Sequence, residues 1–186
     1  PNQLTGAVSP GGTAFSYCKG GTAMKTREIA RAAVLVAMAV ALSPLFIPVG
    51  VSKCYPAQHM INVIAGVVLG PLYAVAVAFT AAVLRNLLGL GSLLAFPGSM
   101  IGALLAGLAY RSFRNVAAAG IGEVVGTGLL GALASAWLVA PVLMEKTMAA
   151  GALMIAFSIS SVGGTVIGII ALKFLQRVKV WTPESR

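Results

Sequence analysis

Six apolar stretches, separated by short polar or glycine- and proline-containing segments, dominate the chain between residues 26 and 177. Their apolar residues do not alternate with polar ones as in a half-buried strand, and this pattern predicts helices rather than a barrel. The predicted helices are Thr26–Ile47, Ala57–Leu69, Leu72–Leu88, Pro97–Tyr110, Val116–Val139 and Ala149–Arg177, with a loop over Val49–Pro56. The second and fourth are short for ~30 Å of hydrocarbon, so one of them would be re-entrant or strongly tilted.

The composition indicates that lipid surrounds these helices. The chain is 59% hydrophobic and only 9% charged, whereas a soluble domain carries about 25% charged residues. The mean hydropathy is +0.96. A surface with so few charges cannot be covered by water-soluble groups, and we therefore expect an all-α membrane protein.

The positive charges indicate how the helices cross the membrane. The net charge of +9 would suit nucleic acid, but the 13 Lys and Arg residues flank the apolar stretches, as in positive-inside topology. With six membrane spans, ten of these residues lie on the same side of the membrane as the two termini, and three lie on the opposite side. The ten are Lys19, Lys25, Arg27, Arg31, Arg111, Arg114, Lys173, Arg177, Lys179 and Arg186, and the three are Lys53, Arg85 and Lys146. We expect six spans with both termini cytoplasmic and no nucleic-acid partner.

Domain boundaries follow from the same pattern. Residues 1–23 are rich in Gly, Pro, Ser and Thr, and we expect a disordered tail or a non-native extension, because Met24 looks like a more natural start. Residues 24–180 form one six-helix transmembrane substrate-binding domain, and residues 181–186 form a cytoplasmic tail. Cys18 and Cys54 fall on opposite sides of the first helix, so a disulfide within the chain is not expected, and no metal-ligand spacing is present.

Three polar residues begin the second helix. Gln58 and Asn62 are four residues apart, and Asn62 follows His59, the only histidine, by three, so all three can share one helical face. Such a set at the mouth of an apolar helix is typical of ligand contacts. The alternative is that the three side chains only cap the helix in the headgroup layer.

The expected topology gathers further polar residues at the outer end of the bundle. They are Lys53, Tyr55, Gln58, His59, Asn62, Arg85, Asn86, Ser99 and Trp137, with Ser158 and Ser161 two to three turns into the last helix. Hydrogen-bonding and aromatic groups clustered in this way indicate a pocket for a small polar ligand. A through-channel is disfavoured, because no ladder of intramembrane charges connects the two faces.

Glu123 lies apart in this prediction, about two turns from the cytoplasmic end of the fifth helix. A carboxylate inside a membrane needs a partner, a proton or water, and Gly122 and Gly126 would let a neighbouring helix approach it. Ligand contact, contact with a partner protein and a structural hydrogen bond to another helix all remain open. The chain has no nucleophile elbow, phosphate-binding loop or carboxylate pair, so we expect no enzyme, no catalytic residue, no metal and no cofactor.

Several segments resemble the ThiW family. They are the run KCYPAQHMINVIAGVVLGPLYA, the run VLRNLLGLG and the run LLAFPGSMIGALLAGLAYR, within a resemblance over about Met24 to Lys179. ThiW proteins are substrate-capture (S) components of energy-coupling-factor (ECF) importers in the prokaryotic plasma membrane. The resemblance implies that the chain captures a thiamine precursor, hydroxyethylthiazole, from outside. It also implies that the chain docks onto a transmembrane coupling subunit that carries two cytoplasmic ATPase subunits.

The resemblance assigns roles to residues. Ala33, Ala37 and Ala41 recur at every fourth residue of the first helix and match the family's docking pattern. In the site, His59, Asn62, Gln58 and Asn86 could hydrogen-bond the hydroxyl and ring nitrogen of the ligand, and Trp137 or Tyr55 could stack on its ring. Two alternatives are a solitary secondary transporter, which would usually show two related halves, and a membrane enzyme centred on His59.

Overall fold

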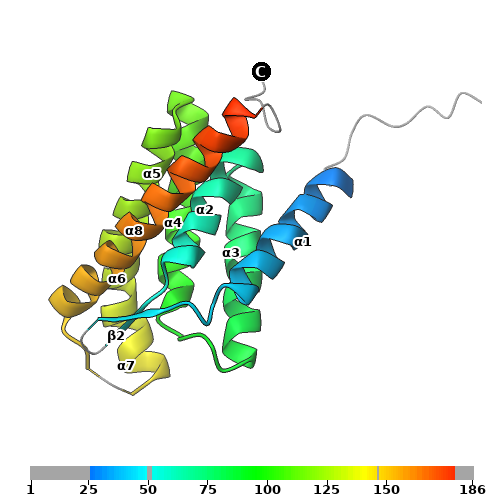
Figure 1. Cartoon of the computed structure of the whole chain (residues 1–186). Coiled ribbons are helices and arrows are strands. Elements are labelled where there is room, and N and C mark those ends of the chain that lie inside the picture. The colour runs from blue at the N-terminus through cyan, green and yellow to red at the C-terminus, as the bar shows by residue number, and fades with distance from the viewer. Residues whose placement is uncertain (1–25, 50–51, 146, 179–186) are drawn as a thin grey trace, which may run out of the picture.

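The computed structural model describes residues 26–49, 52–145 and 147–178, and Figure 1 shows their arrangement. The expected tails 1–23 and 181–186, including Cys18, lie outside the described residues, as do Lys146 and the side chain of Lys53. Six continuous helical segments make up most of the described chain. They are α1 (Thr26–Ala41), α2 (Pro56–Val68), α3 (Pro71–Leu87), α4 (Ala95–Phe113), the segment Val116–Leu143 and α8 (Ala150–Arg177).

The segment Val116–Leu143 is one long helix with two wider turns. It comprises α5 (Val116–Val125), the π-helical turn η1 (Gly126–Gly131), α6 (Ala132–Ala134), a second π-helical turn η2 (Ser135–Val139) and α7 (Ala140–Leu143). This helix and α8 each have 28 residues and are long and apolar enough to cross a membrane. At 1.5 Å per residue each is about 42 Å long, more than the ~30 Å of hydrocarbon.

The first helix is shorter than the sequence pattern predicts. It ends at Ala41 instead of Ile47, and Ile47–Val49 forms strand β1, which pairs antiparallel with β2 (Ser52–Cys54). Pro44 explains the early end, because a proline ring clashes with the carbonyl of the preceding helical turn. The side chain of Ser43 donates to the Ala39 carbonyl at 2.7 Å. The expected loop over Val49–Pro56 is therefore partly a β-hairpin.

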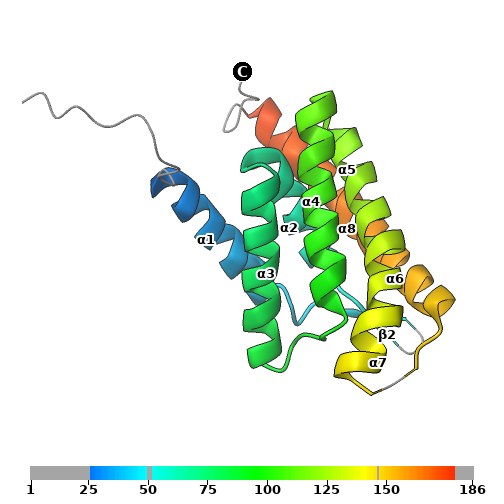
Figure 2. The ribbon, with the colours of Figure 1, turned by 180° about the vertical axis from the view of Figure 1, so that it is seen from behind.

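The helices run roughly alongside one another, and α1 leans outward from the others (Figures 1 and 2). The start of α1, the end of α8 and the α4–α5 connection lie at one end of the bundle, while the hairpin and α7 lie at the other. The central helix α2 begins well inside the bundle, because the chain passes from the hairpin inward before the helix starts. The first turn of α2 therefore lies deep, between α4, α5 and α8.

Glycines allow the helices around α2 to touch backbone to backbone. A Cβ at Gly66 would lie 2.9 Å from the backbone nitrogen of Gly107 in α4, and one at Gly126 would lie 2.7 Å from the Cα of Gly102. A Cβ at Gly164 in α8 would overlap the start of α2, 2.7 Å from the Cβ of His59. This glycine seam (Gly66, Gly102, Gly107, Gly126 and Gly164) is a small-residue interface of the kind that lets membrane helices approach closely.

Candidate functional site

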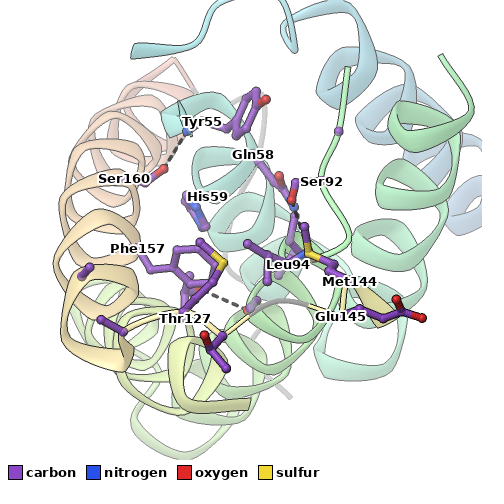
Figure 3. A pocket seen from close by; sticks show the side chains of 18 residues that line it. Tyr55, Gln58, His59, Ser92, Leu94, Thr127, Met144, Glu145, Phe157 and Ser160 are labelled. Carbon is purple, nitrogen blue, oxygen red and sulfur yellow. Dashed lines mark hydrogen bonds between the residues drawn. The ribbon is translucent and has the colours of Figure 1, made fainter. Parts of the chain in front are cut away.

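A cavity of about 910 Å³ opens at the end of the bundle that holds the hairpin and α7. Tyr55, Gln58 and His59 form its wall at the start of α2, and Phe157 and Ser160 face it from α8 (Figure 3). The N-terminal turn of α4 and the connection between α7 and α8 complete the wall. The cavity thus combines hydrogen-bonding groups with two aromatic rings, as sites for small organic ligands do.

Behind the wall, the carboxylate of Glu123 is fully buried, and one of its oxygens has three hydrogen-bonding neighbours. Its Oε1 lies 2.8 Å from Nδ1 of His59, 3.0 Å from Nδ2 of Asn62 and 3.0 Å from Oγ1 of Thr127. The expectation that Glu123 lies apart from the polar cluster was wrong. A structural hydrogen bond to another helix, one of the three alternatives, is present, and it reaches the cavity wall through His59.

The groups around Glu123 are themselves fixed. The amide of Asn62 also donates to the carbonyl of Ser99 at 3.2 Å, and the hydroxyl of Thr127 lies 3.1 Å from the carbonyl of Gly98. Gly102 makes room for the carboxylate, since a Cβ there would lie 2.7 Å from Oε2 of Glu123. We call this set, with His59, the buried carboxylate cluster. It joins α2, α4 and α5 at the depth where α2 begins.

A buried guanidinium lies on the other side of Gln58. Arg85 is 1% exposed, its Nη1 donates to Oε1 of Gln58, and its Cζ lies 4.2 Å from the ring centroid of Tyr55. Among the described residues, no carboxylate lies within ion-pair distance of it. A cation over an aromatic face is stabilised by the ring quadrupole, so Arg85 supports both Tyr55 and Gln58 from behind. The backbone N–H of Tyr55 donates to the hydroxyl of Ser160 at 2.8 Å, which joins α2 to α8.

The structure brings together only part of the predicted site. Tyr55, Gln58 and His59 line the cavity, whereas Asn62 lies beneath it. Asn86 does not line it, because its amide donates to the Ala82 carbonyl at 2.8 Å, one turn back on its own helix. Trp137 does not line it either and is 72% exposed on the outside of η2. The wider turns of η1 and η2 change which residues face inward, and Trp137 lies on the outer side of this helix.

The cavity residues that the sequence pattern did not predict include Thr127, Phe157 and Ser160. Ser158 and Ser161 were expected instead of Ser160, but neither lines the cavity, and the hydroxyl of Ser161 donates to the carbonyl of Ser158 at 3.2 Å. Helical spacing could have found the correct face, because Phe157, Ser160 and Gly164 recur every three to four residues.

Cys54 is enclosed at the edge of the site. It is 1% exposed, and its thiol donates to the carbonyl of Ala156 at 3.3 Å. Burial raises the pKa of the Cys54 thiol, because removing water disfavours the thiolate. The residue therefore ties the hairpin to α8 and has little thiolate character.

A second hollow, of about 710 Å³, runs between α1 and α3. Ala33, Ala37 and Ala41 line it and are exposed, and Tyr73 and Thr80 face them from α3. The alanines thus form an open face of α1 and are not packed inside the bundle. We call this hollow the α1–α3 groove.

The long apolar helices are those of a helical membrane protein, and the cavity at one end of the bundle has the lining typical of sites for small molecules. The chain belongs to the ThiW family, because the family model described as "Thiamine-precursor transporter protein (ThiW)" matches residues 29–178. Membership makes it a transport protein for a thiamine precursor, and transport rather than catalysis is the activity the family carries. Neither curated proteins nor solved structures give a significant match.

Proposed function

We propose that the chain is the substrate-capture component of an ECF-type importer and that it binds hydroxyethylthiazole from outside the cell. The observation that carries this proposal is the cavity at the tip of α2, where Gln58 and His59 lie beside the rings of Tyr55 and Phe157. Hydroxyethylthiazole has a flat ring, a ring nitrogen acceptor and one hydroxyl. The two aromatic side chains can pack on the ring, while Gln58 and His59 can hydrogen-bond its polar groups.

The ligand chemistry favours the uncharged thiazole alcohol over a phosphate ester. Arg85 is the buried cation nearest this wall, but it does not line the cavity and lies against Gln58 and Tyr55. A phosphate needs several donors or cations in direct reach. The cavity wall is largely apolar, and apart from Glu145 its polar groups are neutral, which suits a neutral ligand.

The proposed orientation has six membrane spans, with both termini in the cytoplasm. The start of α1 and the end of α8 lie at the same end of the bundle (Figure 1), and the positive charges in the sequence concentrate there. The cavity lies at the opposite end and would open to the outside of the prokaryotic plasma membrane. This orientation suits a protein that captures its ligand before import.

Import would require partners that supply the energy. We propose that the α1–α3 groove, with Ala33, Ala37 and Ala41, is where a transmembrane coupling subunit docks. Small exposed side chains allow the helix of a partner to come close. The cytoplasmic ATPase subunits would bind to that coupling subunit.

Binding and uptake measurements test this proposal. The purified full chain in lipid nanodiscs is titrated calorimetrically with hydroxyethylthiazole, hydroxymethylpyrimidine and thiamine, and we expect the thiazole to bind tightest. Uptake of labelled thiazole into cells is expected only when coupling and ATPase subunits are co-produced. Tighter binding of the pyrimidine or of thiamine would overturn the ligand assignment, and uptake by the chain alone would indicate a solitary transporter.

A further inference from the structure

We infer that Glu123 is a positioning residue that holds the imidazole of His59 as the Nδ1–H tautomer. The other ring nitrogen, Nε2, then presents a lone pair to the cavity and selects a ligand that donates a hydrogen bond. For hydroxyethylthiazole the donating group is the hydroxyl. The identity of the ligand rests on the proposed function, whereas the tautomer of His59 rests on the geometry of the buried carboxylate cluster.

The hydrogen-bond directions in the cluster follow from Asn62. Its Nδ2 faces two oxygens, the carbonyl of Ser99 at 3.2 Å and Oε1 of Glu123 at 3.0 Å. A backbone carbonyl can only accept, so the NH₂ group must be the end of the amide that points this way. Oε1 of Glu123 is consequently an acceptor. With Glu123 as a carboxylate, the proton of the 2.8 Å contact sits on Nδ1 of His59, because the partner of one ring nitrogen sets which nitrogen is protonated.

The balance of buried charge indicates that His59 is neutral. Among the described residues other than His59, Glu123 is the only buried acid and Arg85 the only buried base. Arginine stays charged inside proteins, and a carboxylate at Glu123 supplies the balancing negative charge. The charges of these two residues already cancel. A proton on both nitrogens of His59 would therefore leave an excess positive charge in a low-dielectric interior. The neutral Nδ1–H form has no such cost.

The ring has little freedom to choose another arrangement. Gly164 of α8 lies directly against the start of α2, where a Cβ would come within 2.7 Å of the Cβ of His59. Gly102 lies equally close to the carboxylate of Glu123. With Nδ1 engaged in the core, Nε2 is the polar atom of His59 that remains for a ligand in the cavity.

Nitrogen NMR tests the tautomer directly, because His59 is the only histidine in the chain. The full chain is labelled with ¹⁵N-histidine in nanodiscs, and the ring signals then report one residue. We expect a protonated Nδ1 and an unprotonated Nε2, with Nε2 shifting when hydroxyethylthiazole is added. A protonated Nε2, alone or together with Nδ1, would overturn the inference.

Two variants separate positioning from mere support of the fold. In Glu123→Gln the amide oxygen can still accept from His59, Asn62 and Thr127, so the Nδ1–H signal should persist. In Glu123→Met the acceptor is gone, and the proton should move to Nε2. If Glu123→Met folds and keeps the Nδ1–H tautomer, Glu123 does not position His59. If that variant does not fold, the signals of the unmodified chain and of Glu123→Gln still decide the question.

A ligand without the hydroxyl tests the selectivity. We expect 5-ethyl-4-methylthiazole, which is smaller and cannot clash, to bind about 5- to 150-fold more weakly than hydroxyethylthiazole. This difference should disappear in His59→Ala. Equal binding of both ligands to the unmodified chain would refute the selectivity while leaving the transport proposal intact. If no thiazole binds but the Nδ1–H tautomer is found, the proposed ligand is wrong and the role of Glu123 stands.

Discussion

Nδ1 of His59 lies 2.8 Å from Oε1 of Glu123, although 64 residues separate the two in the chain. The contact joins the wall of the cavity to the fully buried interior, because His59 lines the cavity and Glu123 is 0% exposed. A substitution at Glu123 should therefore change the affinity for a ligand that does not contact Glu123. The predictions below separate such indirect effects from direct contacts.

Replacing His59 should weaken ligand binding without loss of expression or helicity, although Glu123 loses one of its partners. Loss of a ligand hydrogen bond costs about 1–3 kcal/mol, or about 5- to 150-fold in affinity, and calorimetry on His59→Ala measures it. Asn62→Ala should act indirectly by loosening Glu123. The matched control is Asn86→Ala, because Asn86 bonds only its own helix. An equal loss in Asn86→Ala would contradict the assignment of the cavity.

An added methyl group at Gly164 should destabilise the protein, whereas the same change at Gly163 should not. A Cβ at Gly164 would lie 2.9 Å from the backbone nitrogen of Met60, while one at Gly163 would have its nearest neighbour at 3.9 Å, an ordinary contact. Overpacking typically costs about 1–3 kcal/mol. Thermal unfolding in detergent compares Gly164→Ala with Gly163→Ala. Equal unfolding temperatures would show that α8 can shift away from α2 without cost.

Cys54 should react slowly with maleimide. The thiolate is the nucleophile, and burial raises the pKa of the Cys54 thiol, so its deprotonation and its reaction shift to higher pH than for an ordinary cysteine. Labelling rates across a pH series, in a Cys18→Ser background, test this. The matched control is Glu145→Cys, which places a thiol at an exposed position. A rate for Cys54 equal to that control would contradict its burial.

Because Cys54 is shielded, single added cysteines can report the orientation of the chain. Glu145 lies at the end of the bundle that holds the cavity, and Phe113, 73% exposed, lies near the other end. In the Cys18→Ser background, Glu145→Cys should be labelled by an impermeant reagent in intact cells, and Phe113→Cys only after lysis. The reverse pattern would place the cavity in the cytoplasm and exclude capture from outside.

A bulky residue in the α1–α3 groove should block docking and spare ligand binding. Ala37→Trp fills the groove, so that a partner helix can no longer approach closely, and co-purification with the coupling and ATPase subunits should be lost. The matched control is Val34→Trp, since Val34 is exposed on the same helix but does not line the groove. Calorimetry should find ligand binding unchanged in both. Loss of ligand binding in Ala37→Trp would show that this face is internal.

The apolar pattern predicted the number of helices and most of their limits, because burial of long apolar runs leaves few alternatives. The polar residues at the start of α2 also indicated a site at this position, and Tyr55, Gln58 and His59 do line the cavity. The partnership with Glu123 could not be predicted in this way. Counting turns assumes that each helix begins at a membrane face, but α2 begins inside the bundle (Figure 1). His59 therefore lies at the depth of Glu123.

The two π-helical turns account for another failure. A regular helix over Val116–Val139 would repeat every 3.6 residues, and each wider turn shifts the faces that follow it. Trp137, which comes after η1, is consequently exposed. No residue pattern in this segment announces the wider turns. The face of a long helix beyond such a turn has to be taken from the structure.

The glycine seam divides the chain into positions with very different freedom to vary. Between Gly102 and Gly126 the two backbones are in contact. No residue is smaller than glycine, and a larger residue would push the helices apart. Only glycine is therefore tolerated at these positions. The wall formed by the α7–α8 connection is less constrained, because Met144 and Met148 line the cavity and are only partly buried. Substitutions at Met144 or Met148 during evolution could therefore change which ligand is bound, while the helix packing that positions Glu123 and His59 stays the same.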